Sequence, residues 1–340
     1  MSATHIGVVW NPSKTSRETL ESGIEAAIQA VLAAGSQGLQ AGDDASAEGG
    51  SGSETAREFA VSWHETSVDD PGRAAAQGAL DAGATVVLAA GGDGTVRAVA
   101  EHLAETGAEA DLGVIPLGTG NLLARNLGIP LNSLPVAFER ALTGESAPLD
   151  IGWAEITLES GVERHAFAVM AGFGIDAHMI TETNDDLKDR AGWLAYVESL
   201  GRALSASEVI DLRLALDGGS AVPERAHTLI VGNCGMLQGG ITLLPDADPG
   251  DGELDLLVLR ADGIVGWADT LRNMVWDNGL RRVLTKAESA QSSATTAHER
   301  MQRLTIELDE PRIFEVDGDD LGATTQIEVS IQAAAIRVRR

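Results

Sequence analysis

Residues 86–103, "VVLAAGGDGTVRAVAEHL", contain an apolar run, a glycine-rich corner and an amphipathic segment, in that order. The apolar run predicts a buried strand, and Val96, Val99 and Leu103 recur at helical spacing. Successive glycines let the backbone turn and present several N–H groups to one anion, and a helix N-terminus adds partial positive charge. The stretch therefore predicts a strand, a phosphate-binding corner and a helix, with Thr95 placed to cap that helix.

A carboxylate, Asp93, lies at the centre of this corner. It would be repelled by a polyphosphate unless a cation lay between them, so Asp93 suggests Mg²⁺ or a contact with a sugar or amide group. The alternative is that Asp93 only holds the turn, as aspartate often does. The corner is not a Walker loop, because no Gly-Lys-Ser/Thr follows, and Arg97 occupies the slot for the third glycine of the dinucleotide fingerprint.

A second corner repeats the design in residues 112–130, "LGVIPLGTGNLLARNLGIP", where a strand is followed by Gly118-Thr119-Gly120-Asn121 and a short helix. A third polar loop, "NPSK" at residues 11–14, follows the first apolar run. Loops at the carboxyl ends of parallel strands point into one crevice. The three loops together therefore suit a long polyphosphate such as ATP.

Strands and helices alternate through the first 140 residues, which predicts an α/β domain with a parallel sheet and helices on both faces. Residues 35–54 are rich in glycine, serine and acidic residues, and we expect them to form a flexible insertion. The predicted strands are 6–10, 59–64, 85–90 and 112–116. Three helices are predicted: one that follows the first strand and runs up to Gly35, one at 73–82 and one at about 95–106.

From about residue 149 the pattern changes to short alternating runs divided by turn residues, which predicts a mainly antiparallel β-sandwich. We therefore expect a nucleotide-binding domain at 1–140 and a β-sandwich domain at 141–340. Helical stretches near 185–205 and 263–284 interrupt the strands, and residues 287–297 have the composition of a loose loop.

Composition excludes several kinds of protein. The net charge of −27 repels nucleic acid and anionic lipid heads at long range, so nucleic acid is not an expected partner. No stretch approaches the roughly 18 consecutive apolar residues of a membrane-spanning helix, and the N-terminus lacks the basic region of a signal peptide, so we expect a cytosolic chain. The single cysteine, Cys234, cannot form an internal disulfide, and no zinc-site spacing is present.

Seven segments, in order, resemble the bacterial diacylglycerol kinase and related lipid kinase family, which includes the sphingosine kinases and shares a nucleotide fold with NAD kinase. They are "NPSK", "GGDGTV", "IPLGTGNLLARNLGIP", "LDIG", "GFGIDA", "VGNCGMLQGGITLLPDADPGDGELDLLVL" and "FEVDGDDLG". The resemblance implies an ATP-dependent kinase with an NAD kinase-like nucleotide domain, a following β-sandwich, and an active site in the cleft between them.

The resemblance also implies roles for particular residues. The Mg²⁺ loop is "PDADPGDGELD", with Asp251 as the carboxylate ligand, linked through Asp150 to Thr119. Asp317 matches the general base and Asp319 the next catalytic carboxylate, although an Asp-Gly pair taken alone is usually a hairpin turn. The implied nucleotide site comprises Asn11, Gly91, Gly92, Asp93, Gly94, Thr95, Gly118, Thr119 and Asn121.

Two positions depart from the family pattern. The family usually has Asp-Gly-Glu where this chain ends the motif with Asp319, and many relatives carry Asn-Glu where this chain has Arg97-Ala98. The first change shortens a carboxylate by one methylene, and the second removes a carboxylate near the first glycine corner. Both motivate an alternative in which the protein binds nucleotide as a non-catalytic regulator.

The acceptor implied by the resemblance is diacylglycerol or a related lipid alcohol at the inner membrane surface, with Lys188 on the acceptor side. The 263–284 segment is read either as an interfacial anchor or as a helix packed on the sandwich. A kinase of a soluble acceptor, such as NAD or a sugar, is a further alternative that the shared nucleotide fold permits. Members of the family are often dimeric, and a homodimer is expected on that ground alone.

Overall fold

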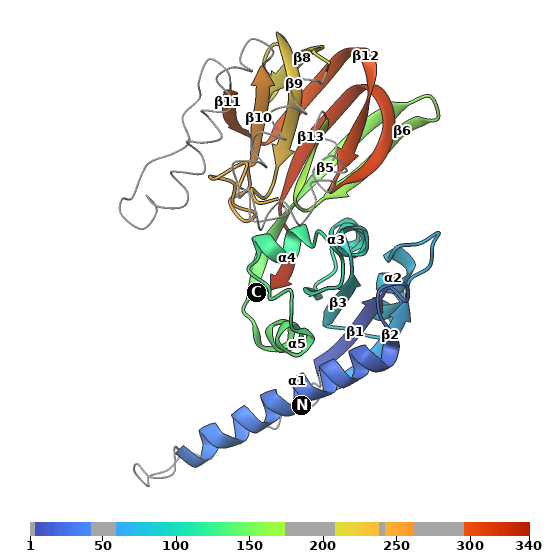
Figure 1. Ribbon diagram of the computed structural model, residues 1–340, viewed down its shortest axis with the longest axis vertical. Coiled ribbons are helices and arrows are strands. Elements are labelled where there is room, and N and C mark those ends of the chain that lie inside the picture. The colour runs from blue at the N-terminus through green and yellow to red at the C-terminus, as the bar shows by residue number, and fades with distance from the viewer. Residues whose placement is uncertain (1–3, 42–58, 174–207, 238–241, 261–295) are drawn as a thin grey trace, which may run out of the picture. The chain divides into compact units, whose positions relative to one another are not determined.

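The computed structural model describes residues 4–41, 59–173, 208–237, 242–260 and 296–340. The chain divides into two compact units, the first comprising Met1–Leu149 with Ala334–Arg340 and the second comprising Asp150–Ala333. The chain therefore changes unit after residue 149 rather than after 140, and its last residues return to the first unit (Figure 1). Lys188 and the helical stretches expected at 185–205 and 263–284 lie outside the described residues.

The strands of the first unit are β1 (Thr4–Trp10), β2 (Phe59–Glu65), β3 (Val86–Gly91), β4 (Asp111–Pro116) and the end of β13 (Asp319–Arg339). β1 pairs in parallel with β2 and β3, β3 pairs in parallel with β4, and Arg337 and Val338 of β13 pair in parallel with β4. β3 and β4 are buried along their whole length, as expected of apolar runs covered on both faces.

The helices described in this unit are α1 (Arg17–Ala41), α2 (Arg73–Asp81), α3 (Asp93–Thr106), α4 (Leu122–Asn126) and α5 (Leu134–Thr143). α1 packs against α5, and α2 packs against α3 and β1. Glycine allows one of these close approaches, because a Cβ on Gly23 would lie 2.9 Å from a ring carbon of Phe138. In the part of the chain that the structure describes, no helix is long and apolar enough to cross a bilayer.

Three local expectations from the sequence are wrong. Helix α1 continues past Gly35 to Ala41, because extending an existing helix costs far less than starting one; the rest of the expected insertion lies outside the described residues. Helix α3 begins at Asp93 with Gly92 as its N-cap and has no side-chain cap bond, so Thr95 is a buried first-turn residue and not the cap. The loop expected at 287–297 overlaps β11, which begins at Thr296.

The second unit is built from antiparallel strands. They are β5 (Ser146–Leu158, entering from the first unit), β6 (Gly161–Phe167), β7 (Met170–Phe173), β8 (Ile210–Leu216), β9 (Val222–Gly232), β10 (Leu254–Arg260), β11 (Thr296–Met301), β12 (Arg303–Val316) and most of β13. β9 pairs with β7, β8 and β10, and β12 pairs with β7, β8 and β13. Phe173 and Phe314 meet edge to face inside the apolar core, with ring centroids 6.5 Å apart.

The end of β13 is fastened to the first unit by a buried carboxylate. Asp111, at the start of β4, is 7% exposed and forms an ion pair of 2.6 Å with Arg339. The hydroxyl of Ser146 donates a hydrogen bond of 2.7 Å to the same carboxylate. Arg340 and Glu145 exchange two backbone hydrogen bonds. The first unit is therefore completed by the last residues of the chain.

Candidate functional site

The two glycine corners of the first unit lie against each other at the carboxyl ends of β3 and β4. The N–H of Leu117 donates to the carbonyl of Gly91 at 2.9 Å. A Cβ on Gly118 would lie 2.7 Å from the Cα of Gly92, a separation that real Cβ atoms essentially never show. The corners therefore pack backbone to backbone, which only glycine at position 118 allows without a shift.

Asp93 joins the two corners through hydrogen bonds. Its Oδ2 accepts the N–H of Asn121 at 2.9 Å, and its Oδ1 accepts the N–H of Leu122 at 2.6 Å. These donors lie at the N-terminus of α4, where backbone N–H groups have no partner within the helix. Of the alternatives left open by the sequence, the structure shows a contact with amide groups, and these amides belong to the protein itself.

The second corner is braced by its own side chains. Asn121 adopts a left-handed conformation with φ of 47°, its Oδ1 accepts the N–H of Gly118, and its Nδ2 donates to the Gly118 carbonyl. The Nε of Arg125 donates to the carbonyl of Gly120 at 2.6 Å. The turn thus holds its shape through bonds that do not depend on a ligand. Thr119 is left exposed at its tip.

Gly92 differs from its neighbours because the fold does not require a glycine there. Its φ is −88°, which any residue adopts, and a Cβ would meet the nearest atoms only at ordinary contact distances: 3.5 Å to the Gly118 Cα and 4.0 Å to the Lys14 Cε. The N-cap position is where phosphates approach the N–H groups of a helix. The helix N-terminus at Gly92, with Lys14 close by, is therefore a candidate position for a phosphate group.

Lys14 is brought here by the loop after β1. The N–H of Asn11 donates to the carbonyl of Ala90 at 3.0 Å, which ties this loop to β3. The Asn11 side chain accepts hydrogen bonds from the N–H and the hydroxyl of Ser13, and the N–H of Lys14 donates to the carbonyl of Asn11. Asn11 therefore shapes the turn that presents Lys14.

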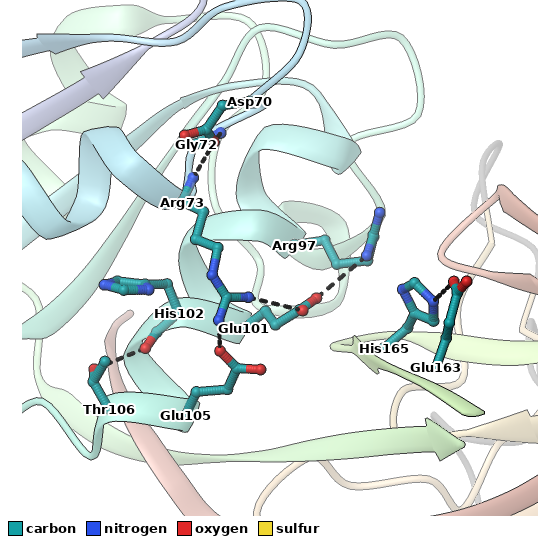
Figure 2. Close-up of polar contacts among 10 residues, drawn as sticks. All are labelled: Asp70, Gly72, Arg73, Arg97, Glu101, His102, Glu105, Thr106, Glu163 and His165. Carbon is teal, nitrogen blue, oxygen red and sulfur yellow. Dashed lines mark hydrogen bonds and ion pairs between the residues drawn. The ribbon is translucent and has the colours of Figure 1, made fainter. Parts of the chain in front are cut away.

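Behind the first corner, α3 carries a network of charged side chains (Figure 2). Arg97 forms an ion pair of 3.4 Å with Glu101, and Arg73 of α2 approaches the other oxygen of Glu101 at 3.4 Å and also pairs with Glu105. Asp70 accepts the N–H groups of Gly72 and Arg73 at the start of α2. The network joins α2 to α3. Its shared carboxylate, Glu101, lies one helical turn after Ala98, the position at which many relatives carry glutamate.

In the second unit, the acidic loop between Leu244 and Leu254 is held by Asp150. The carboxylate of Asp150, 1% exposed, accepts the N–H of Gly252 at 2.7 Å, and the Asp150 N–H donates to the carbonyl of Pro249 at 2.8 Å. Asp251, next to Gly252, is exposed at the loop surface. The predicted link between Asp150 and the loop of Asp251 is present within this unit, whereas Thr119 belongs to the first unit.

Arg300 is the counter-charge of this loop. Its guanidinium lies 3.7 Å from Asp251, 3.5 Å from Glu253 and 3.8 Å from Asp255, and it donates to the carbonyl of Asp246 at 2.9 Å. Among the described residues, no three acidic, histidine or cysteine side chains converge to hold a metal. A divalent ion in this loop would therefore need backbone carbonyls and water beside the Asp251 carboxylate, a ligand set that Mg²⁺ accepts.

Asp255 lies among these acidic side chains, and the pKa of its carboxyl group is raised. Burial raises the pKa of the Asp255 carboxyl to about 6; Arg300 lowers it, whereas Asp251, Asp246 and Glu253 raise it further. The folded protein therefore disfavours the ionised form.

Asp255→Asn is expected to stabilise the protein in a pH-dependent way. Because the folded pKa is raised, Asp255 contributes stability below its unfolded pKa, and that contribution is lost as pH rises through about 6. With Arg300 partly screening the charge, the variant should gain about 1 kcal/mol at pH 8, or about 2–4 °C in thermal midpoint, and nothing at pH 4. Thermal melts in EDTA at both pH values measure this, and an equal gain at pH 4 would contradict it.

Asp317 lies in a two-residue hairpin between β12 and β13. Val316 pairs with Asp319, and Asp317 and Gly318 both have positive φ, of 48° and 88°, as a type I′ turn requires. The Asp317 carboxylate, buried with the residue 9% exposed, accepts three backbone N–H groups, from Ala168 at 2.8 Å and from Val169 and Met170 at 2.9 Å each. Asp319, two residues on, is exposed.

The structure thus groups the predicted residues into three sets. The nine nucleotide-site residues lie on adjoining loops of the first unit, Asp150 and the loop of Asp251 form one set in the second unit, and Asp317 and Asp319 form a hairpin there. Sequence reasoning missed Arg300, the closeness of Lys14 to Gly92, and the buried amide of Asn233. The signal for Lys14 was its rarity, since the chain has few lysines.

Known proteins share this organisation. The diacylglycerol kinase catalytic domain family matches residues 51–154, and the family described as "YegS C-terminal NAD kinase beta sandwich-like domain" matches residues 169–340. A Pseudomonas aeruginosa (strain UCBPP-PA14) protein named "Probable lipid kinase YegS-like" is 32% identical over 293 residues, covering 84% of this chain and 85% of that protein. A Mycobacterium tuberculosis (strain H37Rv) diacylglycerol kinase is 30% identical over 184 residues, covering 54% of this chain and 58% of that protein.

A solved structure agrees with these matches at the level of the fold. The crystal structure of a diacylglycerol kinase from Bacillus anthracis str. Sterne superposes with a TM-score of 0.65 at 18% identity, covering 100% of this chain and 97% of that one. The chain belongs to the diacylglycerol kinase and YegS-like lipid kinase family. The family resemblance of the seven motifs and the C-terminal β-sandwich are thereby confirmed.

Proposed function

We propose that the protein is an ATP-dependent kinase that transfers the γ-phosphoryl group to the hydroxyl of diacylglycerol or a related lipid alcohol. The observation that carries this proposal is Gly92, the N-cap of α3, where neither φ nor the neighbouring atoms require a glycine and where Lys14 lies close to a helix N-terminus without a side-chain cap. Membership of a family whose named relatives are lipid and diacylglycerol kinases supports the reaction class.

The first unit would bind the nucleotide through its backbone. The N–H groups of Asp93, Gly94 and Thr95 form the first turn of α3, which has no side-chain cap bond and is suited to accept phosphate oxygens. Lys14 would add a positive charge beside Gly92. Asp93 keeps the second corner in register by binding the amides of Asn121 and Leu122.

Asp251 and the carbonyl groups of its loop would hold Mg²⁺. When bound, Mg²⁺ and ATP would supply charge neutralisation and the transferable phosphoryl group. The part played by the chain is to present the loop in one shape, and Asp150 does this by binding Gly252 and Pro249. Arg300 balances the loop charge in the structure.

Asp319 is favoured over Asp317 as the group that accepts the proton of the acceptor hydroxyl. A carboxylate has about four acceptor positions, and three backbone N–H donors already occupy three of those of Asp317 and favour its ionised, hydrogen-bonded form. Asp319 is exposed at the start of β13 and follows the turn that Asp317 fixes. Asp317 would thus act as a positioning residue and Asp319 as the base.

A lipid acceptor requires the protein to reach a bilayer, so we propose peripheral association with the inner membrane surface. A homodimer is also proposed, only because members of the family are often dimeric. Lys188, which the motif comparison assigned to the acceptor side, lies outside the described residues and keeps that proposed role.

The test is transfer of radiolabelled phosphate from ATP, with Mg²⁺, to diacylglycerol in mixed micelles and to a panel of soluble alcohols that includes NAD and sugars. Thin-layer separation identifies the labelled product. We expect label in the lipid phase, and its loss when EDTA removes the divalent ion. Label in a soluble product would favour the soluble-acceptor alternative, and ATP binding by calorimetry without transfer to any acceptor would favour a regulator.

A further inference from the structure

Asn233 is a buried amide that lies in the "VGNCGMLQGG" part of the sixth motif and to which the motif assigned no role. It follows β9, is 0% exposed, and its backbone N–H donates to the carbonyl of Val169 at 2.9 Å. Its side-chain Nδ2 donates two hydrogen bonds, to the carbonyl of Asp150 at 2.8 Å and to the carbonyl of Ala168 at 2.9 Å. Both donor hydrogens of one amide are therefore used on two different segments of the second unit.

The two segments are those that hold the two sets of acidic residues. Asp150 binds the loop of Asp251 through Gly252 and Pro249. The N–H of Ala168 is one of the three donors to Asp317. One planar amide group thus stands between the proposed metal loop and the hairpin of the proposed base, separated from each by a single residue.

The orientation of the Asn233 amide is fixed by its surroundings. A flip would place Oδ1 against two carbonyl oxygens, so only Nδ2 can face Asp150 and Ala168. In the described part of the chain, Oδ1 is buried and has no hydrogen-bond partner. A buried acceptor without a partner costs free energy. An apolar side chain would avoid that cost but would remove the Asn233 donor from both carbonyls, and the Ala168 carbonyl would keep only the weak Cys234 thiol donor at 3.5 Å.

We propose that Asn233 is a positioning residue that couples the loop of Asp251 to the hairpin of Asp317 and Asp319, so that metal binding and proton transfer depend on it. The coupling to the reaction rests on the proposed function, whereas the mechanical coupling of the two segments does not. Residues that orient metal-binding groups without touching the metal typically change affinity or activity 10- to 100-fold when replaced.

The experiment compares Asn233→Ala with Thr324→Val in the full-length protein. Thr324 is a matched control because it is 2% exposed in the same unit, and its hydroxyl donates to the carbonyl of Thr157 at 2.8 Å, away from both acidic segments. Both variants lose a buried bond to a carbonyl, so both should melt at a lower temperature. Only Asn233→Ala should speed amide hydrogen exchange, roughly tenfold or more, in both 168–170 and 250–253.

Two further readouts separate positioning from stability. Mn²⁺, titrated by electron paramagnetic resonance as a probe of the loop, should bind Asn233→Ala roughly 10- to 100-fold more weakly than wild type and Thr324→Val equally well. In the lipid assay, kcat should fall by a similar factor with KM for lipid unchanged. Exchange and Mn²⁺ affinity equal to those of Thr324→Val would overturn the proposal.

The wild-type protein supplies a measurement that needs no variant, so a folding failure of Asn233→Ala does not end the test. The amides of Ala168 and Gly252 should open with the same free energy, because one side chain links their segments. Protection factors of these two amides that differ by more than tenfold would overturn the coupling. A wild type that phosphorylates no alcohol would contradict the proposed function and leave these exchange results standing, since they use no substrate.

Discussion

Asp319→Asn is expected to lower kcat by roughly 10²- to 10⁴-fold, the usual contribution of a positioned proton acceptor. The amide keeps the shape of the side chain but cannot take a proton from an alcohol. Because Asp319 is exposed, the thermal midpoint and the affinity for ATP should stay near those of wild type. Initial rates of lipid phosphorylation, with circular dichroism melts of the same preparation, measure both effects.

Asp317→Asn is the matched comparison, and its effect should differ in kind. The new amide nitrogen would face an N–H donor, so at least one of Ala168, Val169 and Met170 would lose its acceptor, at a cost of about 1–3 kcal/mol. We expect a lower thermal midpoint and a smaller loss of kcat than for Asp319→Asn. A stable Asp317→Asn without turnover, beside an active Asp319→Asn, would assign the base to Asp317.

Gly92→Ala should weaken ATP binding roughly 10- to 100-fold without unfolding the protein. The added methyl group meets only ordinary contacts in the chain, at 3.5 Å and 4.0 Å, so the fold accepts it. It would fill the space proposed for a phosphate, and overpacking of about 1–3 kcal/mol corresponds to that loss of affinity. Isothermal titration with a non-hydrolysable ATP analogue gives the affinity directly.

Gly118→Ala provides the contrast on the neighbouring corner. A Cβ there would lie 2.7 Å from the Cα of Gly92 and 3.0 Å from the Oδ1 of Asn121, so backbone must move. This variant should lose thermal stability as well as affinity. Wild-type ATP affinity in Gly92→Ala would remove the observation on which the proposed function depends.

Much of the first unit was predictable because its signals are local. The apolar runs that become β3 and β4, and the glycines that follow them, are consecutive in sequence and need no distant partner to be recognised. The role of Asp93 was not predictable, since its partners Asn121 and Leu122 lie 28 and 29 positions away and a carboxylate in a turn suits a cation equally well. The wrong prediction that Thr95 caps the helix has the same origin. The N-cap is Gly92, whose backbone packs against Gly118 of the second corner, and this contact is not visible in the local sequence.

For the acidic residues of the second unit, the motif predicted the positions but not the environments of the side chains. The motif located Asp317 and Asp319 but did not separate a carboxylate that binds three backbone amides from one that faces solvent. That distinction depends on the 168–170 segment, about 150 residues earlier in the chain. The motif that contains Asn233 did not predict its role, because that role depends on the two carbonyl groups that its side chain meets, those of Asp150 and Ala168.

The return of residues 334–340 to the first unit has a consequence for biosynthesis. A ribosome releases these residues only after the whole second unit, so the parallel sheet of the first unit stays incomplete until then, with the outer edge of β4 unpaired. During that interval Asp111 lacks Arg339, its counter-charge. The nascent first unit therefore exposes a strand edge that can pair with other chains, and a C-terminus shortened before Arg337 would leave that edge exposed in the finished protein.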